Sequence, residues 1–165
     1  MSAFLISQVL AGLAFVFGMA SFQFKPRKTV LLCIFFCAIF NASHFLVLER
    51  YGVGTLVFVN ALRFLVAAFF PSQRWMWFFL GLSVISFSFT WTDVIGLLGL
   101  AATLIGTVGT FKQSDREVRH YLMWVSSFWV VHNLLVGSPV AMLMEACFLL
   151  SNYWGWRRFY SGYKK

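Results

Sequence analysis

Residues 29–48 read TVLLCIFFCAIFNASHFLVL and contain no Asp, Glu, Lys or Arg. A helix needs about 20 predominantly apolar residues to cross the hydrocarbon core of a bilayer, and this stretch has that length. A helix is favoured over a barrel strand because the run is long and uniformly apolar, and because a helix satisfies its backbone hydrogen bonds internally. The stretch therefore predicts a transmembrane helix.

The same pattern recurs before and after this stretch, where charged clusters, Pro and Gly separate further apolar runs. The weakest break lies at Thr92-Asp93, where only Asp93 and a few polar residues interrupt the apolar run. We predict an all-α membrane protein with seven transmembrane helices, at residues 4–22, 29–48, 53–70, 75–92, 94–111, 119–136 and 139–157.

The composition of the 165-residue chain agrees with this prediction, since 61% of its residues are hydrophobic and 11% are charged. Soluble domains have about 45–50% apolar and about 25% charged residues. A sizeable soluble domain is therefore excluded, and with it most soluble catalytic folds and nucleic-acid modules. The net charge of +8 is better explained by basic cytoplasmic loops than by nucleic-acid binding.

The positions of the 13 Lys and Arg residues predict the orientation. If the N-terminus lies outside, all of them fall in inside segments except Arg50, which lies outside, and Arg63, which lies within the third span. An unbroken helix over 75–111 would move the cations of 112–119 outside and reduce this asymmetry. We therefore expect the N-terminus out and the C-terminus in, with a short basic cytoplasmic tail.

Four short matches recur in the same order in the two ends of the chain, which indicates an internal repeat. They are Gly12-Leu13-Ala14 with Gly99-Leu100-Ala101, and Phe24-Lys25 with Phe111-Lys112, both at an offset of 87; His44-Phe45-Leu46-Val47 with His132-Asn133-Leu134-Leu135 at 88; and Asn60-Ala61 with Glu145-Ala146 at 85.

A repeat unit of three helices crosses the membrane an odd number of times. One extra helix between two such units returns the second unit to the orientation of the first, which gives parallel repeats about an axis along the membrane normal. The predicted organisation is a first repeat at 1–72, a linker helix at 73–92 and a second repeat at 93–165.

This 3+1+3 plan resembles that of the SWEET sugar carriers, PQ-loop proteins and PnuC vitamin transporters. Over nearly its whole length the chain more closely resembles the YgjV family of small bacterial inner-membrane proteins, through Gln8-x-x-x-Gly12, Phe22-Gln23-Phe24-Lys25 and Asn60-x-x-Arg63. The YgjV resemblance implies a multi-pass protein of the bacterial inner membrane. Because Pro26, Pro71 and Pro139 lie at helix ends, the proline hinges of the SWEET carriers are not carried over.

Polar side chains within the apolar runs are the candidate site, because an ionisable group costs about 2.5–3.5 kcal/mol at the centre of a membrane helix. On the sixth span Trp124, Phe128, Trp129 and His132 form an aromatic wall at helical spacing. Such a wall suits a ring-shaped solute, although aromatic residues are also common at membrane interfaces. The predicted solute-binding residues are Asn41, His44, Asn60, Arg63, Trp129, His132 and Glu145.

Two pairs among these residues carry specific hypotheses. His44 and His132 occupy equivalent places in the two repeats and would face each other across the axis, where they would either couple binding to protons or only hold helices together. Arg63 and Glu145 would form an ion pair that offsets part of both insertion costs. The SWEET resemblance implies a sugar-contacting role for Asn60, whereas Glu145 departs from the asparagine expected there.

The chain has no hydrolase, metalloprotease or phosphate-loop motif and no paired-cysteine motif, so we predict no enzyme, no metal and no cofactor. The leading hypothesis is a small-solute transporter or facilitator with a midplane site that opens alternately to each side. The alternative is a non-transporting membrane protein, such as a sensor, assembly factor or partner-binding subunit. The expected partners are the lipid bilayer and a small polar or ring-containing metabolite, and no nucleic acid is expected. The sequence leaves open whether the protein forms a homo-oligomer.

Overall fold

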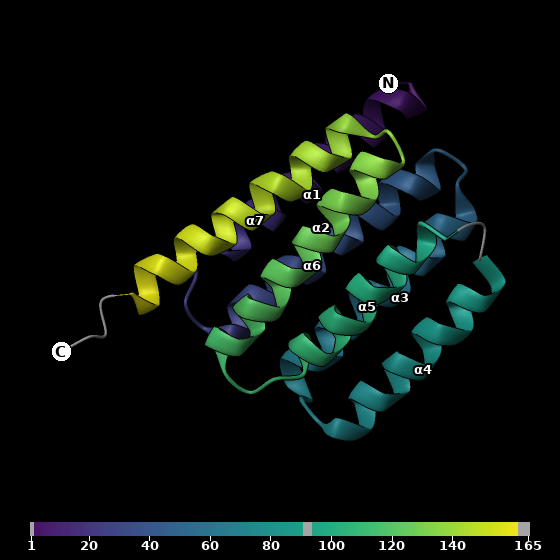
Figure 1. Cartoon of the computed structure of the whole chain (residues 1–165). Coiled ribbons are helices and arrows are strands. Elements are labelled where there is room, and N and C mark those ends of the chain that lie inside the picture. The colour runs from purple at the N-terminus through teal and green to yellow at the C-terminus, as the bar shows by residue number, and fades with distance from the viewer. Residues whose placement is uncertain (1, 91–93, 162–165) are drawn as a thin grey trace. The chain divides into compact units, whose positions relative to one another are not determined.

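The computed structural model describes residues 2–90 and 94–161, and these residues form seven helices joined by short connections (Figure 1). Each helix begins and ends within a few residues of its prediction, while the predicted break at Thr92-Asp93 lies outside the described residues. The helices are α1 (Ala3–Ser21), α2 (Arg27–Val47), α3 (Tyr51–Phe69), α4 (Gln73–Thr90), α5 (Gly96–Thr110), α6 (Asp115–Leu135) and α7 (Pro139–Tyr160).

The largest difference from prediction is at the start of α6, which begins at Asp115 rather than at residue 119. Ser114 occupies the N-cap position, and Asp115 and Glu117 lie in the first turn, where negative charge interacts favourably with the helix dipole. Division of the sequence at charged clusters assigned this first turn to the preceding loop. The two carboxylates therefore belong to the start of the helix and not to the loop before it.

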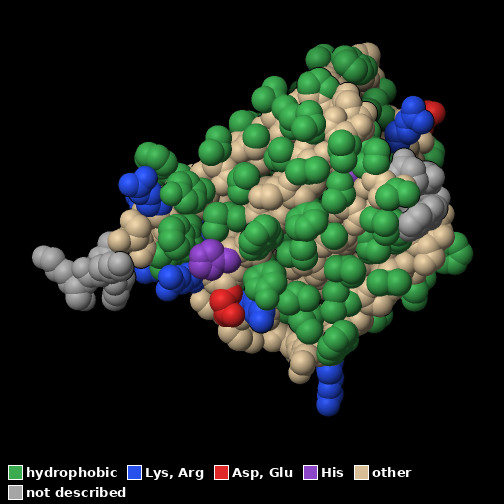
Figure 2. Space-filling model, viewed as in Figure 1, with side chains coloured by type: hydrophobic (Ala, Val, Ile, Leu, Met, Phe, Trp, Pro, Cys, Tyr) green, Lys and Arg blue, Asp and Glu red, His purple; other side chains and the backbone are tan. Residues whose placement is uncertain are grey.

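Three of the described helices, α1, α2 and α3, are by themselves long and apolar enough to cross a membrane, and α5 is apolar but shorter. Large hydrophobic side chains on other helices are also exposed, among them Trp77, Phe89 and Val140. Figure 2 shows that hydrophobic side chains cover most of the visible face and that charged ones gather toward its edges. That all seven helices cross the membrane, with the predicted orientation, stays a prediction.

The helices form two compact units, Met1–Phe69 and Phe70–Lys165. In the first unit α2 packs against both α1 and α3. In the second unit α6 packs against both α5 and α7, and α4 packs against α5, so that α4 to α7 lie side by side in chain order (Figure 1). The predicted divisions at residues 72 and 92 stay predictions.

Small residues allow these helices to approach closely, as is common in membrane proteins. The buried residues of α1 are Ser7, Ala14, Gly18 and Ser21. Gly109 in α5 is an extreme case, because a Cβ atom at this position would lie 2.2 Å from the Cβ of Tyr121 on α6. Contact between α5 and α6 therefore depends on the missing side chain.

We expect Gly109→Ala to destabilise the second unit, because the new methyl group would overlap a Tyr121 atom that is fixed to the α6 backbone. Overpacking of this kind costs about 1–3 kcal/mol. The measurement is the thermal unfolding midpoint in detergent. Gly12→Ala is the matched control, since no atom lies within 4 Å of a Cβ there; equal midpoints for the two variants would contradict the close α5–α6 contact.

The ends of α2 and α6 have the same geometry. After α2 the N–H groups of Glu49 and Arg50 donate to the carbonyls of Leu46 and Phe45, and Glu49 has a φ of 59°. After α6 the N–H groups of Gly137 and Ser138 donate to the carbonyls of Leu134 and Asn133, and Gly137 has a φ of 75°. Both ends are Schellman motifs, in which glycine is the favoured left-handed residue. Glu49 and Gly137 therefore occupy equivalent positions, and so do Arg50 and Ser138. At the end of α2 a glutamate occupies the left-handed position in which glycine is expected.

We expect Glu49→Gly to raise the unfolding midpoint and Gly137→Ala to lower it, because a left-handed backbone costs a residue with a Cβ atom about 1 kcal/mol. A Cβ at Gly137 would meet no atom within 4 Å, so only the backbone conformation is tested there. Thermal unfolding of both variants in the same detergent measures the two effects. A lower midpoint for Glu49→Gly would show that the Glu49 side chain has a stabilising role that outweighs its backbone strain.

In the first unit the start of α2 is bonded to the end of α3. The Nη2 of Arg27, at the start of α2, donates a hydrogen bond of 2.9 Å to the carbonyl of Ala67 near the end of α3. The Nζ of Lys28 lies 4.1 Å from the centre of the Phe69 ring. The last carbonyls of a helix have no partner within the helix, and cations interact favourably with that end. These basic residues therefore join α2 and α3.

Candidate functional site

His44 on α2 is held by the neighbouring helix α1. Its Nδ1 lies 2.8 Å from the backbone carbonyl oxygen of Ser7. A carbonyl oxygen can only accept, so the proton is on Nδ1 and the ring donates this bond. The ring also meets Phe45 edge-on, with 5.0 Å between centres. Asn41, one helical turn earlier, is half-buried.

Arg63 is the most buried ionisable side chain of the first unit, with 6% of its surface exposed. It lies on α3, and its guanidinium carbon is 4.7 Å from the centre of the Phe64 ring. Asn60, one turn earlier on the same helix, is half-buried. A buried cation is costly unless its surroundings compensate it, and the solute-binding role of Arg63 stays a prediction.

Trp129 and His132 on α6 lie together. Their rings meet edge-on with 5.0 Å between centres. Both pack over Gly99 of α5, where a Cβ atom would lie 3.2 Å from the Trp129 ring and 3.9 Å from the Cδ2 of His132. The Nδ1 of His132 is buried and has no hydrogen-bond partner among the residues that the structure describes. His132 thus differs from His44, whose corresponding atom is bonded.

Glu145 on α7 is held by the hydroxyl of Ser126 on α6, which hydrogen-bonds to its carboxyl group. Ser126 is buried, with 6% of its surface exposed. This partner was not predicted from the sequence. A single serine in an apolar helix has no distinguishing pattern there, and only the packing of α6 on α7 makes it a partner.

The structure therefore brings together part of the predicted site. Trp129 and His132 are in contact, and His44 and Glu145 each bond to an adjacent helix. The ion pair between Arg63 and Glu145 and the facing of His44 toward His132 would join the two compact units, and both stay predictions.

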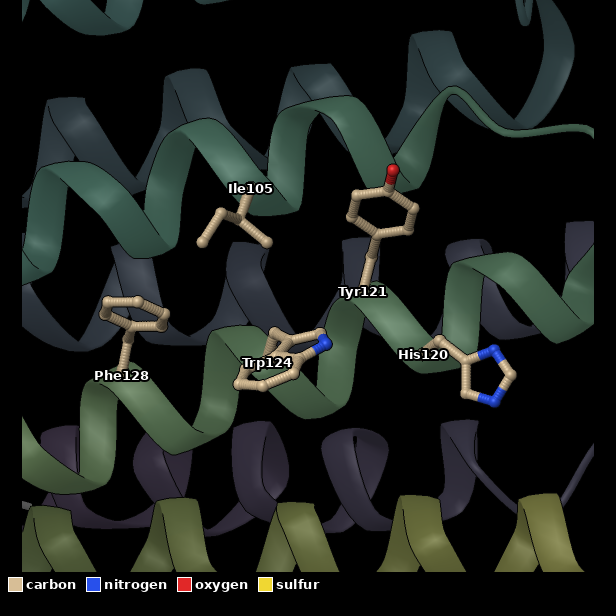
Figure 3. Close-up of a pocket in the computed structure, with 5 residues that line it drawn as sticks. All are labelled: Ile105, His120, Tyr121, Trp124 and Phe128. Atoms are coloured by element: carbon tan, nitrogen blue, oxygen red, sulfur yellow. The ribbon is translucent and has the colours of Figure 1, made fainter.

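The aromatic wall predicted on α6 divides into two parts. Trp129 and His132 face Gly99, as described above. Trp124 and Phe128 instead line a groove of about 370 Å³ with Ile105 of α5 and with His120 and Tyr121 of α6 (Figure 3).

A buried polar cluster between α6 and α7 was missed by the sequence analysis. Arg119 is wholly buried, and its Nε lies 3.2 Å from the Oδ2 of Asp115. The hydroxyl of Tyr160 donates to the same oxygen, and the Nδ2 of Asn152 donates to the Arg119 carbonyl at 2.9 Å. The sequence predicts that Arg119 belongs to an inside loop, whereas it lies in the second turn of α6. The Asp-x-x-x-Arg spacing was the available signal, because such residues meet on one helix face.

Among the described residues no group of three or more His, Cys, Asp and Glu side chains is placed to hold a metal ion. The three cysteines, Cys33, Cys37 and Cys147, are half-buried, and none of them forms a disulfide among the described residues.

Comparison with known proteins gives the family. A family model described as bacterial inner membrane protein, Imp-YgjV, matches residues 5–162. The chain belongs to the YgjV family. It is also similar to inner membrane protein YgjV of Escherichia coli (strain K12), with 26% identity over 162 residues that cover 92% of this chain and 83% of that protein. No solved structure matches the chain.

Membership of the YgjV family confirms the resemblance inferred from the sequence and places the protein in the bacterial inner membrane. The apolar helices α1 to α3 agree with this location. In that setting the bond between Glu145 and Ser126 joins α7 to α6, and the buried Arg119–Asp115 pair lies within α6.

We expect Asp115→Asn to destabilise the protein, because Arg119 would keep its buried charge and lose its counter-ion. Removal of one partner of a buried pair costs about 3–5 kcal/mol. The measurement is thermal unfolding in detergent. Glu117→Gln is the matched control, since it removes an exposed carboxylate two residues away. A midpoint for Asp115→Asn equal to that of the control would show that Arg119 does not depend on Asp115.

Proposed function

We propose that this YgjV-family protein is a small-solute carrier or facilitator of the inner membrane, without enzymatic activity. The observation that carries the proposal is the state of His132. Its Nδ1 is buried beside Trp129 without a partner among the described residues, whereas the Nδ1 of His44 is bonded to Ser7. An unmade hydrogen bond in a buried place costs about 1–3 kcal/mol, so its retention favours a ligand that completes it.

An internal repeat supports the proposed architecture of two parallel three-helix bundles and a linker. The Schellman residues Glu49 and Gly137 are 88 positions apart, as are the two histidines. Buried positions recur at the same offset of 88 in α2 and α6. They pair Val30 with Val118, Leu31 with Arg119, and Ala38 with Ser126.

In such an architecture the solute site lies near the membrane midplane between the two bundles, and rocking of one bundle against the other exposes it to each side in turn. Asn41, His44, Asn60 and Arg63 would line it from the first bundle, and Trp129, His132 and Glu145 from the second. The flat indole of Trp129 and the imidazole beside it suit a small polar metabolite that contains a ring.

A second candidate function, a non-transporting membrane protein, is favoured by different contacts. His44 bonds to α1 and Glu145 bonds to α6, so each joins neighbouring helices as polar residues do in membrane proteins that need only to pack. Under this alternative His132 only packs against Trp129 and over Gly99, so its removal would lower the unfolding midpoint, and no solute would bind at its ring.

A thermal-shift screen of small metabolites on the purified protein tests the proposal. A solute at a hundred times its Kd adds about 2.7 kcal/mol of stability, which is a shift of several degrees. We expect His132→Ala and Glu145→Ala to lose at least half of the shift given by such a solute. Each variant is compared with its own midpoint without solute, so that its effect on folding is removed.

Asn133→Ala is the matched control, because Asn133 is the next residue on α6 and is half-buried. It should keep the full solute-induced shift. If a stabilising solute acts equally on wild type, His132→Ala and Glu145→Ala, the proposed site is wrong. If the screen gives no stabilising solute and His132→Ala has a lower midpoint, the non-transporting alternative is supported instead.

A further inference from the structure

The groove between α5 and α6 is a concave feature that is separate from the residues assigned to the solute site. Its volume is about 370 Å³, and its wall is made by Ile105, Tyr121, Trp124 and Phe128, with His120 at one end. In Figure 3 the lining residues of α6 form a row along that helix from His120 to Phe128, and Ile105 lies beside them on α5. Trp124 has 64% of its surface exposed, so the groove is open to its surroundings.

The chemistry of this groove changes along its length. Ile105, Trp124 and Phe128 offer almost entirely apolar surface. His120 lies near the start of α6, where the α5–α6 loop brings the Nζ of Lys112 to 5.5 Å from the centre of the Tyr121 ring. The groove therefore has an apolar length and a polar end.

The charges at the polar end are predominantly positive. Arg116 is exposed one helical turn before His120, and Lys112 lies beside Tyr121. Glu117 is the one exposed carboxylate on that turn. Asp115 and Arg119 also lie at this end of α6, but they are paired with each other. This end of the groove thus has two cations, Lys112 and Arg116, and one exposed carboxylate, so its net charge is positive.

We propose that this groove binds an anionic phospholipid, with one acyl chain along Trp124 and Phe128 and the phosphate near Lys112 and Arg116. Basic pockets at the ends of membrane helices recognise anionic headgroups, and each basic residue near such a headgroup contributes about 1 kcal/mol. A compact polar solute would need hydrogen-bonding groups along the whole wall, whereas an amphiphile needs them only at one end. The proposal is independent of the proposed transport function, since none of these residues belongs to that site.

Native mass spectrometry of the full-length protein in detergent tests this inference, with phosphatidylglycerol as the anionic probe and phosphatidylcholine as the zwitterionic one. We expect the protein to retain phosphatidylglycerol in preference to phosphatidylcholine. Lys112→Gln and Arg116→Gln should each weaken phosphatidylglycerol binding about fivefold, which corresponds to the loss of about 1 kcal/mol per cation. Arg74→Gln is the matched control, because Arg74 is an exposed cation at the start of α4, and it should bind phosphatidylglycerol as the wild type does.

The position of the acyl chain needs its own measurement. Phosphatidylglycerol with brominated acyl chains, added in equimolar amount to the protein in detergent, quenches a tryptophan that it touches. We expect Trp124→Phe to lose a substantial part of the quenching seen in the wild type. Trp77→Phe removes another exposed tryptophan, on α4, and should retain it.

Three results would overturn the inference. One is equal retention of phosphatidylglycerol and phosphatidylcholine by the wild type, and another is unchanged binding in the double variant of Lys112 and Arg116. The third is a lipid-free dimer that Trp124→Phe converts to a monomer, because this would assign the groove to a second copy of the chain.

Discussion

The interior of this protein is organised by the need to satisfy polar groups without water. In a membrane every buried donor and acceptor must find its partner within the protein, since lipid offers none. The His44 ring is satisfied by a backbone carbonyl of α1, the Glu145 carboxyl group by Ser126, and the Arg119 side chain by Asp115. The first two bonds join neighbouring helices, and the third lies within the first two turns of α6. Among the described residues the requirement is not met everywhere, because the Nδ1 of His132 has no partner there and the Oδ1 atoms of Asp115 and Asn152 share that state.

Small side chains are the second condition, because these polar contacts need helices that lie close together. Gly99 makes room for Trp129 and His132, and Gly109 makes room for Tyr121. One helix, α5, thus shapes its contact with α6 through the absence of side chains at two places. The binding features of the second unit follow from this arrangement. The rings that pack over Gly99 belong to the proposed solute site, while Trp124 and Phe128 line the groove.

Much of the helical fold could be predicted from the sequence, because long apolar runs and their breaks report directly on transfer into a bilayer. The start of α6 could not be placed by hydropathy, since its first turn holds Asp115 and Glu117, which resemble a loop in composition. The candidate site was harder. His44 and His132 look equivalent in sequence, and yet the partner of His44 is a backbone carbonyl, a group that every residue has. Ser126 and the burial of Arg119 likewise depend on which faces of α6 and α7 meet.

The hydrogen bond from Arg27 to the Ala67 carbonyl has a consequence for the order of folding. With the Schellman turn at Glu49 it makes α2 and α3 a hairpin that is bonded at both ends by residues of the first unit. The contacts of the turn join residues 45 to 50 and form with a small loss of chain entropy, and they bring the two helices together so that the bond from Arg27, which spans 40 residues, can form next. The first unit, Met1–Phe69, contains all of the partners that it needs for this closure. Synthesis from the N-terminus would therefore deliver a self-contained hairpin to the membrane before α5 to α7 have left the ribosome.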